Sequence, residues 1–194
     1  RMMSPASVMK LLTSHAALDL RGPAYTWKTR AWLAGELIDG RLAGDVLILG
    51  SGDPDLSWDR LGQWLRDWRS RGLREIRGDI LVDRRLIPTG PQAPFDDAPH
   101  RAYNARPDAF LVNFGALAVR LTPENGKVAA VASLPVSPLR IINRLRAVEG
   151  ACVTWRDGLR GSFQPEGRGF VLTLDGKLPT SCGEKSYNLA VHDS

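Results

Sequence analysis

The first pattern of apolar positions predicts a helix from Pro5 to about Leu20. Ser4 is a typical N-cap residue, Pro5 suits the first helical position, and Gly22-Pro23 is a typical stop. Apolar residues occupy nearly the whole circumference rather than one stripe, namely Ala6, Val8, Met9, Leu11, Leu12, Ala16, Ala17 and Leu18. Because such a helix is buried on most sides, we expect it to need a large host fold.

A second helix is predicted to begin after Ser57, which suits the N-cap position, and to end at Gly72. Its apolar residues recur at the spacing i, i+3, i+4 and i+7, namely Leu61, Trp64, Leu65 and Trp68. A single stripe at this spacing indicates a helix that packs one face against a core.

Most of the remaining chain has the patterns of β-strands. Apolar and polar residues alternate from Ala24 to Leu33, and Asp45–Leu49 is a short apolar run. Further strands are predicted at Asp79–Val82, Phe110–Leu121, Val128–Ala132, Ile141–Trp155, Gly169–Leu174 and Asn188–Val191. The proline-containing stretch Arg84–Asp108 is predicted to be a long irregular loop. These elements indicate an α+β fold that is mostly β after the first helix.

Length and composition agree with a globular chain. The sequence has 194 residues, of which 43% are hydrophobic and 24% charged. This length allows one domain or two small ones. No apolar run approaches the roughly 18 residues of a membrane-spanning helix, so we expect no transmembrane segment.

The chain is basic, with a formal net charge of +5. This charge favours anionic partners in general and selects none of them. The densest arginine cluster alternates with Asp67 and Glu75 and comprises Arg66, Arg69, Arg71, Arg74 and Arg77. No nucleic-acid-binding motif accompanies it, so we interpret it as a solvated face and expect no nucleic-acid partner.

The two cysteines, Cys152 and Cys182, are too few for a zinc site and have no Cys-x-x-Cys spacing. We expect no metal and no cofactor. Two buried free thiols and one disulfide are the alternatives. Of these we predict the disulfide, which would indicate an oxidising compartment.

The chemistry with the clearest pattern is the Ser-x-x-Lys formed by Ser7 and Lys10. The three-residue spacing places both side chains on the same side of the predicted helix. A serine hydroxyl becomes a strong nucleophile when a neighbouring base takes its proton, and a lysine can be that base when burial lowers its pKa. Ser7 also lies in the first turn, where free backbone N–H groups can stabilise an oxyanion.

The residues around and after this pair resemble a known family. The stretch Pro5–Thr13 with Ala16–Leu18 is similar to the nucleophile helix of penicillin-recognising serine enzymes. Ordered motifs follow it, namely Gly22–Tyr25 with Thr29-Arg30, Gly44-Asp45, Gly50–Leu56, Ile76–Asp79 ending in Asp83, Asp96-Asp97, and Pro107–Ala109 with Asn113. From Pro5 to about Asp193, the chain resembles the D-alanyl-D-alanine carboxypeptidase/endopeptidase family, the class C low-molecular-mass penicillin-binding proteins.

The resemblance implies a serine enzyme that hydrolyses the stem peptides of peptidoglycan in the periplasm and that β-lactams inhibit covalently. The nucleophile attacks the penultimate D-alanine, the terminal D-alanine leaves, and water releases the acyl-enzyme. Ser7 matches the nucleophile and Lys10 the base. Asp97 matches an acidic position that faces the active site and suits the free ammonium of a diaminopimelate side chain. No cofactor is implied.

The sequence also departs from the family pattern. It contains no Lys-Thr-Gly or Lys-Ser-Gly, and the literal Ser-x-Asn at Ser186–Asn188 runs into an apolar strand pattern. We therefore interpret Ser186–Asn188 as a strand. The resemblance then implies part of a transpeptidase domain with its nucleophile helix at 1–38, a β-rich inserted region at 39–190, and a return toward the transpeptidase domain at 191–194. We expect this chain alone to be incomplete and inactive.

Two function classes remain open at this point. The first is a serine-type D-Ala-D-Ala carboxypeptidase/endopeptidase. The second is a non-catalytic peptidoglycan-binding or scaffolding module in which Ser7 and Lys10 are relics. Covalent labelling of Ser7 by a penicillin distinguishes them, because only the enzyme forms the acyl bond.

Overall fold

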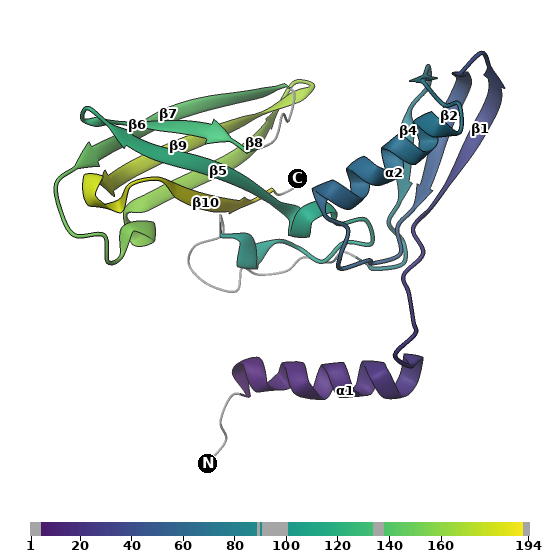
Figure 1. Cartoon of the computed structure of the whole chain (residues 1–194), viewed down its shortest axis with the longest axis horizontal. Coiled ribbons are helices and arrows are strands. Elements are labelled where there is room, and N and C mark those ends of the chain that lie inside the picture. The colour runs from purple at the N-terminus through teal and green to yellow at the C-terminus, as the bar shows by residue number, and fades with distance from the viewer. Residues whose placement is uncertain (1–4, 89, 91–100, 134–137, 192–194) are drawn as a thin grey trace.

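The computed structural model describes residues 5–88, 90, 101–133 and 138–191. It has the predicted α+β architecture. One N-terminal helix, α1, lies apart from two β-sheets, and a second helix, α2, packs on the first sheet (Figure 1).

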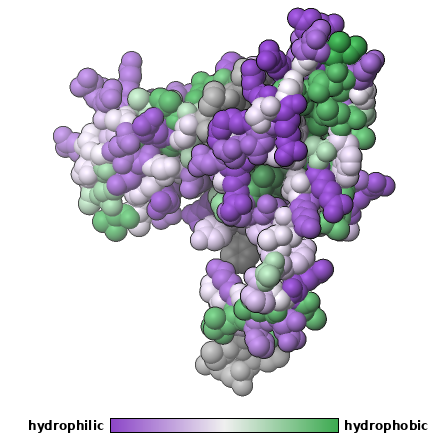
Figure 2. Space-filling view, turned by 45° about the vertical axis from the view of Figure 1, so that its right-hand side comes forward, coloured by the Kyte–Doolittle hydropathy of each residue, from purple (hydrophilic) through white to green (hydrophobic). Residues whose placement is uncertain are grey.

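Helix α1 (Met9–Arg21) follows a short 3-10 turn at Ala6–Val8, and none of its residues is buried. It ends where Gly22, with a φ of 76°, donates its N–H to the Leu18 carbonyl at 2.9 Å. The predicted cap Ser4 lies outside the described residues. Figure 2 shows the apolar side chains of α1 at the surface. Within the described residues, no helix has the length and apolar character needed to cross a bilayer.

The four-stranded sheet has β2 at its centre. Strand β2 pairs antiparallel with β1 and parallel with both β3 and β4. The bounds are β1 (Arg30–Ile38), β2 (Arg41–Leu49), β3 (Glu75–Ile76) and β4 (Ile80–Asp83). Alternate residues of β2 are buried beneath α2 (Trp58–Ser70), whose Trp64 and Trp68 pack on them. The predicted cap is confirmed, because the Ser57 hydroxyl accepts the Arg60 N–H.

Strands β1 and β2 form a hairpin through Asp39 and Gly40, both with positive φ, as a tight two-residue turn requires. The predicted boundary between residues 38 and 39 falls in this turn. The strand predicted from Ala24 also begins only at Arg30. An alternating pattern indicates side-chain direction and does not supply a partner strand, and residues 24–29 pair with no strand of the described structure.

The six-stranded sheet has the order β10-β5-β6-β7-β9-β8. The bounds are β5 (Ala116–Glu124), β6 (Lys127–Ala132), β7 (Leu139–Val148), β8 (Leu159–Glu166), β9 (Gly169–Pro179) and β10 (Lys185–Ala190). Its core is built from alternate residues such as Leu117, Val119 and Leu121 of β5, each at most 1% exposed. The edge strands approach each other, since a Cβ at Gly161 would lie 2.5 Å from the Leu189 side chain.

Other strand predictions were also wrong in extent. The segment predicted from Phe110 becomes a strand only at Ala116, because a turn with positive φ at Asn113 and Phe114 precedes it. The strand predicted to reach Trp155 ends at Val148, where a disulfide-containing loop begins. Strand β9 continues to Pro179. Strand β8 was not predicted, because a glycine and a proline weaken its strand pattern.

The predicted disulfide is confirmed, because Cys152 and Cys182 are bonded. The bond lies just beyond the last paired residues of β7 and β9, Val148 and Pro179, which run parallel. It therefore closes a 30-residue separation at the ends of two central strands.

We expect the double variant Cys152→Ser/Cys182→Ser to lose about 3 to 4 kcal/mol of unfolding free energy, because a crosslink of this span restricts the unfolded chain. Urea denaturation followed by tryptophan fluorescence measures the loss. Wild-type protein with and without reductant is the control. Equal unfolding free energies of the wild-type protein and the double variant would contradict the prediction. So would two free thiols in unreduced, denatured wild-type protein.

Candidate functional site

The candidate nucleophile and base lie at the beginning of the N-terminal helix. Ser7 is in the 3-10 turn, Lys10 is in the first turn of α1, and both are exposed. Spacing by three residues keeps them on the same side of the helix in either kind of turn. Across the described parts of the chain, no hydrogen bond joins the Ser7 hydroxyl to the Lys10 amine.

The backbone just before Ser7 is unusual. Ala6 has a φ of 44°, in the left-handed region that a residue with a Cβ rarely adopts. Backbone outliers of this kind gather at functional sites. Sequence patterns give no signal for this feature, because alanine is an ordinary helix residue.

The other predicted residues do not join this pair in the described structure. Ser186 and Asn188 lie on β10, exposed and paired with Arg120 and Ala118 of β5, so the prediction that they form a strand is confirmed. Asp97 lies outside the described residues.

Several motifs that carry the family resemblance form turns of the scaffold. The Asp45 carboxylate accepts the Asp79 N–H at 2.8 Å and so ties β2 to the start of β4. A Cβ at Gly78 would lie 2.2 Å from the same carboxylate oxygen, so only glycine fits there. The Thr29 and Ser51 hydroxyls are 3.0 Å apart and join the entry of β1 to the exit of β2.

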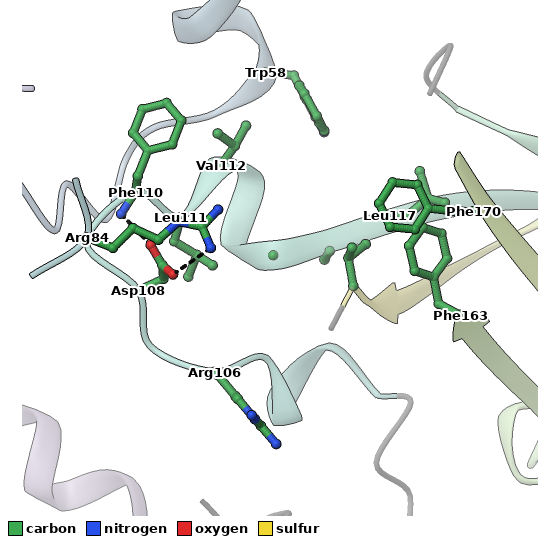
Figure 3. A pocket seen from close by; sticks show the side chains of 13 residues that line it. Trp58, Arg84, Arg106, Asp108, Phe110, Leu111, Val112, Leu117, Phe163 and Phe170 are labelled. Atoms are coloured by element: carbon green, nitrogen blue, oxygen red, sulfur yellow. Dashed lines mark hydrogen bonds and ion pairs between the residues drawn. The ribbon is translucent and has the colours of Figure 1, made fainter. Parts of the chain in front are cut away.

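Sequence reasoning missed a cleft between the two sheets, with a volume of about 370 Å³ (Figure 3). The start of α2, the segment before β5, and strands β8 and β9 line it. The lining side chains that bear on its chemistry are Trp58, Arg84, Arg106, Asp108, Phe163 and Phe170. The rings of Phe163 and Phe170 are stacked, with centroids 4.8 Å apart.

A tight turn forms part of the cleft lining. Asn113 donates its backbone N–H to the Leu56 carbonyl at 2.8 Å and its side-chain amide to the Ala116 carbonyl at 2.9 Å. Val191 donates its N–H to the Gly115 carbonyl at 2.7 Å. These bonds connect both sheets through one turn, which indicates a preformed junction.

Charges on one wall of the cleft are partly compensated. Arg84 lies 3.5 Å from the Asp108 carboxylate, which also accepts the Phe110 N–H at 2.7 Å. Nearby Asp83 is engaged by Arg85, whose side-chain hydrogen bonds lower the pKa of Asp83 to about 2. Both carboxylates thus have a cationic partner.

Comparison with known proteins identifies the family. The model of the D-Ala-D-Ala carboxypeptidase 3 (S13) family matches residues 1–194. A D-alanyl-D-alanine carboxypeptidase of Actinomadura sp. strain R39 is 37% identical over 81 residues, which are 41% of this chain and 15% of that protein. The D-alanyl-D-alanine carboxypeptidase DacB of Haemophilus influenzae is 30% identical over 81 residues, which are 42% of this chain and 17% of that protein.

Solved structures share the fold. The crystal structure of penicillin binding protein 4 from Haemophilus influenzae superposes with a TM-score of 0.73 at 19% identity, over 98% of this chain and 42% of that one. The same protein in complex with a β-lactam superposes with a TM-score of 0.63 at 20% identity, over 98% of this chain and 40% of that one. Because the family model covers the whole chain, this chain belongs to the D-Ala-D-Ala carboxypeptidase 3 (S13) family.

Proposed function

We propose that this chain supplies the nucleophile and the base of a serine-type D-Ala-D-Ala carboxypeptidase/endopeptidase that acts on peptidoglycan stem peptides. The observation that carries the proposal is the family match over residues 1–194, with Ser7 and Lys10 at Ser-x-x-Lys spacing where the first helix begins. Asp97 is proposed to receive the ammonium group of the substrate.

The chemistry follows from these assignments. The neutral Lys10 amine takes the proton of the Ser7 hydroxyl while the Ser7 oxygen attacks the carbonyl carbon of the penultimate D-alanine. The C–N bond to the terminal D-alanine breaks, and the leaving amine takes the proton that Lys10 removed from Ser7, which returns Lys10 to its starting form. Water then attacks the acyl-enzyme, which restores the hydroxyl and releases the shortened peptide. A β-lactam forms the same bond to Ser7 through its ring carbonyl.

We also propose a periplasmic location. The Cys152–Cys182 bond supports it, because disulfides persist in oxidising compartments. A non-catalytic peptidoglycan-binding module is the alternative function. Labelling with a fluorescent penicillin separates the two, since a module without a working nucleophile forms no covalent adduct.

We expect the 194-residue chain alone to react with penicillin at least a hundredfold more slowly than the gene product that contains it. Ser7 and Lys10 are exposed, and the sequence has no Lys-[Ser/Thr]-Gly to hold a substrate carboxylate. A single missing oxyanion donor costs about 3 to 4 kcal/mol of transition-state stabilisation. Intact mass spectrometry over time measures the adduct. Stoichiometric labelling of the chain within minutes would contradict the expectation.

In the gene product that contains this chain, Lys10→Ala is expected to slow acylation by a β-lactam by about two to four orders of magnitude, because a positioned general base is lost. Stopped-flow or gel-based labelling gives the rate constant. Lys127→Ala is the matched control, since Lys127 is exposed on the β5–β6 hairpin. Unchanged acylation of the Lys10→Ala protein would exclude Lys10 as the base.

Replacement of Asp97 tests the proposed substrate contact. In the same gene product, Asp97→Asn is expected to weaken hydrolysis of diaminopimelate-containing peptides by about 1.5 to 3 kcal/mol, the size of a charge-assisted hydrogen bond. Acylation by a small β-lactam without an ammonium group should be unchanged. Equal losses in kcat/KM for both compounds would show that Asp97 has a structural role.

A further inference from the structure

The cleft between the two sheets has the size and lining of a binding site. Its volume of about 370 Å³ falls within the range of about 300–1,000 Å³ typical of ligand pockets. The stacked Phe163 and Phe170 form one wall, and Leu111 and Val112 lie across from them (Figure 3). Ser7 and Lys10 are not among its lining residues.

The cleft carries an uncompensated positive charge. Arg84 and Asp108 form an ion pair, so their charges largely cancel. Arg106 lines the same cleft, is exposed, and has no ion-pair partner anywhere in the described part of the chain. The charged side chains that line the cleft therefore sum to about +1, which complements one carboxylate.

Trp58, which lines the cleft, has a hydrogen-bond donor without a partner in the described structure. The indole N–H of Trp58, at the start of α2, is buried and has no hydrogen-bond partner in the described structure. A buried donor without a partner costs about 1–3 kcal/mol, and few such groups occur in folded proteins. Trp58 lines the cleft but its indole nitrogen is not exposed to it, so an acceptor on a bound molecule would remove this cost after a small turn of the ring.

We infer that the cleft binds a short peptide that ends in a free carboxylate. The carboxylate would pair with Arg106, a peptide carbonyl would accept the Trp58 indole N–H, and small apolar side chains would contact Phe163 and Phe170. Stem peptides of peptidoglycan have this chemistry, and that identification rests on the proposed function. The cleft would then hold a peptide between the four-stranded and six-stranded sheets, away from Ser7.

The indole N–H resonance of Trp58 provides a direct test in the 194-residue chain. We expect N-acetyl-D-alanyl-D-alanine to shift this resonance in a saturable ¹H–¹⁵N titration, while the resonances of Trp64 and Trp68, which pack on the four-stranded sheet, stay in place. Trp58→Phe assigns the signal. The C-terminal carboxamide of the peptide should bind about tenfold more weakly, because it lacks the charge. A Trp58 resonance that does not move would overturn the inference.

Arg106→Gln is expected to raise the dissociation constant of the free-acid peptide about tenfold. Arg146→Gln is the matched control, because Arg146 is exposed on β7 and does not line the cleft. Equal effects of the two variants would overturn the assignment of Arg106. Ser7→Ala should leave the titration unchanged. The outcome is thus separate from acylation of Ser7, and either proposal can fail while the other stands.

Discussion

The close backbone contact between Gly50 and Ala109 determines how the two sheets meet. A Cβ at Gly50 would lie 2.5 Å from the Ala109 carbonyl oxygen, and Gly52 donates its N–H to that oxygen at 2.7 Å. The end of β2 and the segment before β5 are therefore held at backbone distance, which only glycine permits. Asp108 and Phe110, on either side of Ala109, line the inter-sheet cleft, so this contact helps to position part of the lining.

Most of the motifs that carry the family resemblance shape the scaffold and do not take part in the proposed chemistry. Gly50, Asp45 and Asn113 belong to motifs that resemble the family, yet each one positions backbone: Asp45 holds the start of β4, and Asn113 joins the α2 region to β5. Among the described motifs, Ser7 and Lys10 are the residues proposed to carry the chemistry. Much of the resemblance therefore reflects a shared scaffold. A variant of Gly50 would disturb the cleft without changing Ser7 or Lys10.

Local patterns predicted the elements that have a clear period or a continuous apolar run. Helix α2 was predicted from its single apolar stripe and its Ser57 cap, and β10 from its apolar run. Strand β8 was not predicted because Gly161 and Pro165 interrupt its strand pattern, although it pairs with β9, the next strand along the chain. The inter-sheet cleft was also invisible, since Trp58, Arg106 and Phe163 come together only through the tertiary fold. For the candidate site, spacing predicted that Ser7 and Lys10 share one side of a helix, and the lack of a host for this apolar helix within the chain predicted its exposure.

The exposed N-terminal helix connects stability with the proposed chemistry. Helix α1 has 13 residues and buries none of them, and isolated helices of this length are marginal in water. Its apolar side chains surround the helix, so a partner surface that covered them would remove water from Lys10 as well. A lysine acts as a base near neutral pH when burial or a neighbouring charge lowers its pKa. If Ser7 and Lys10 have the proposed roles, the partner surface that buries the apolar side chains of α1 also activates Ser7. The Ser7 hydroxyl then stays unreactive until that surface is bound.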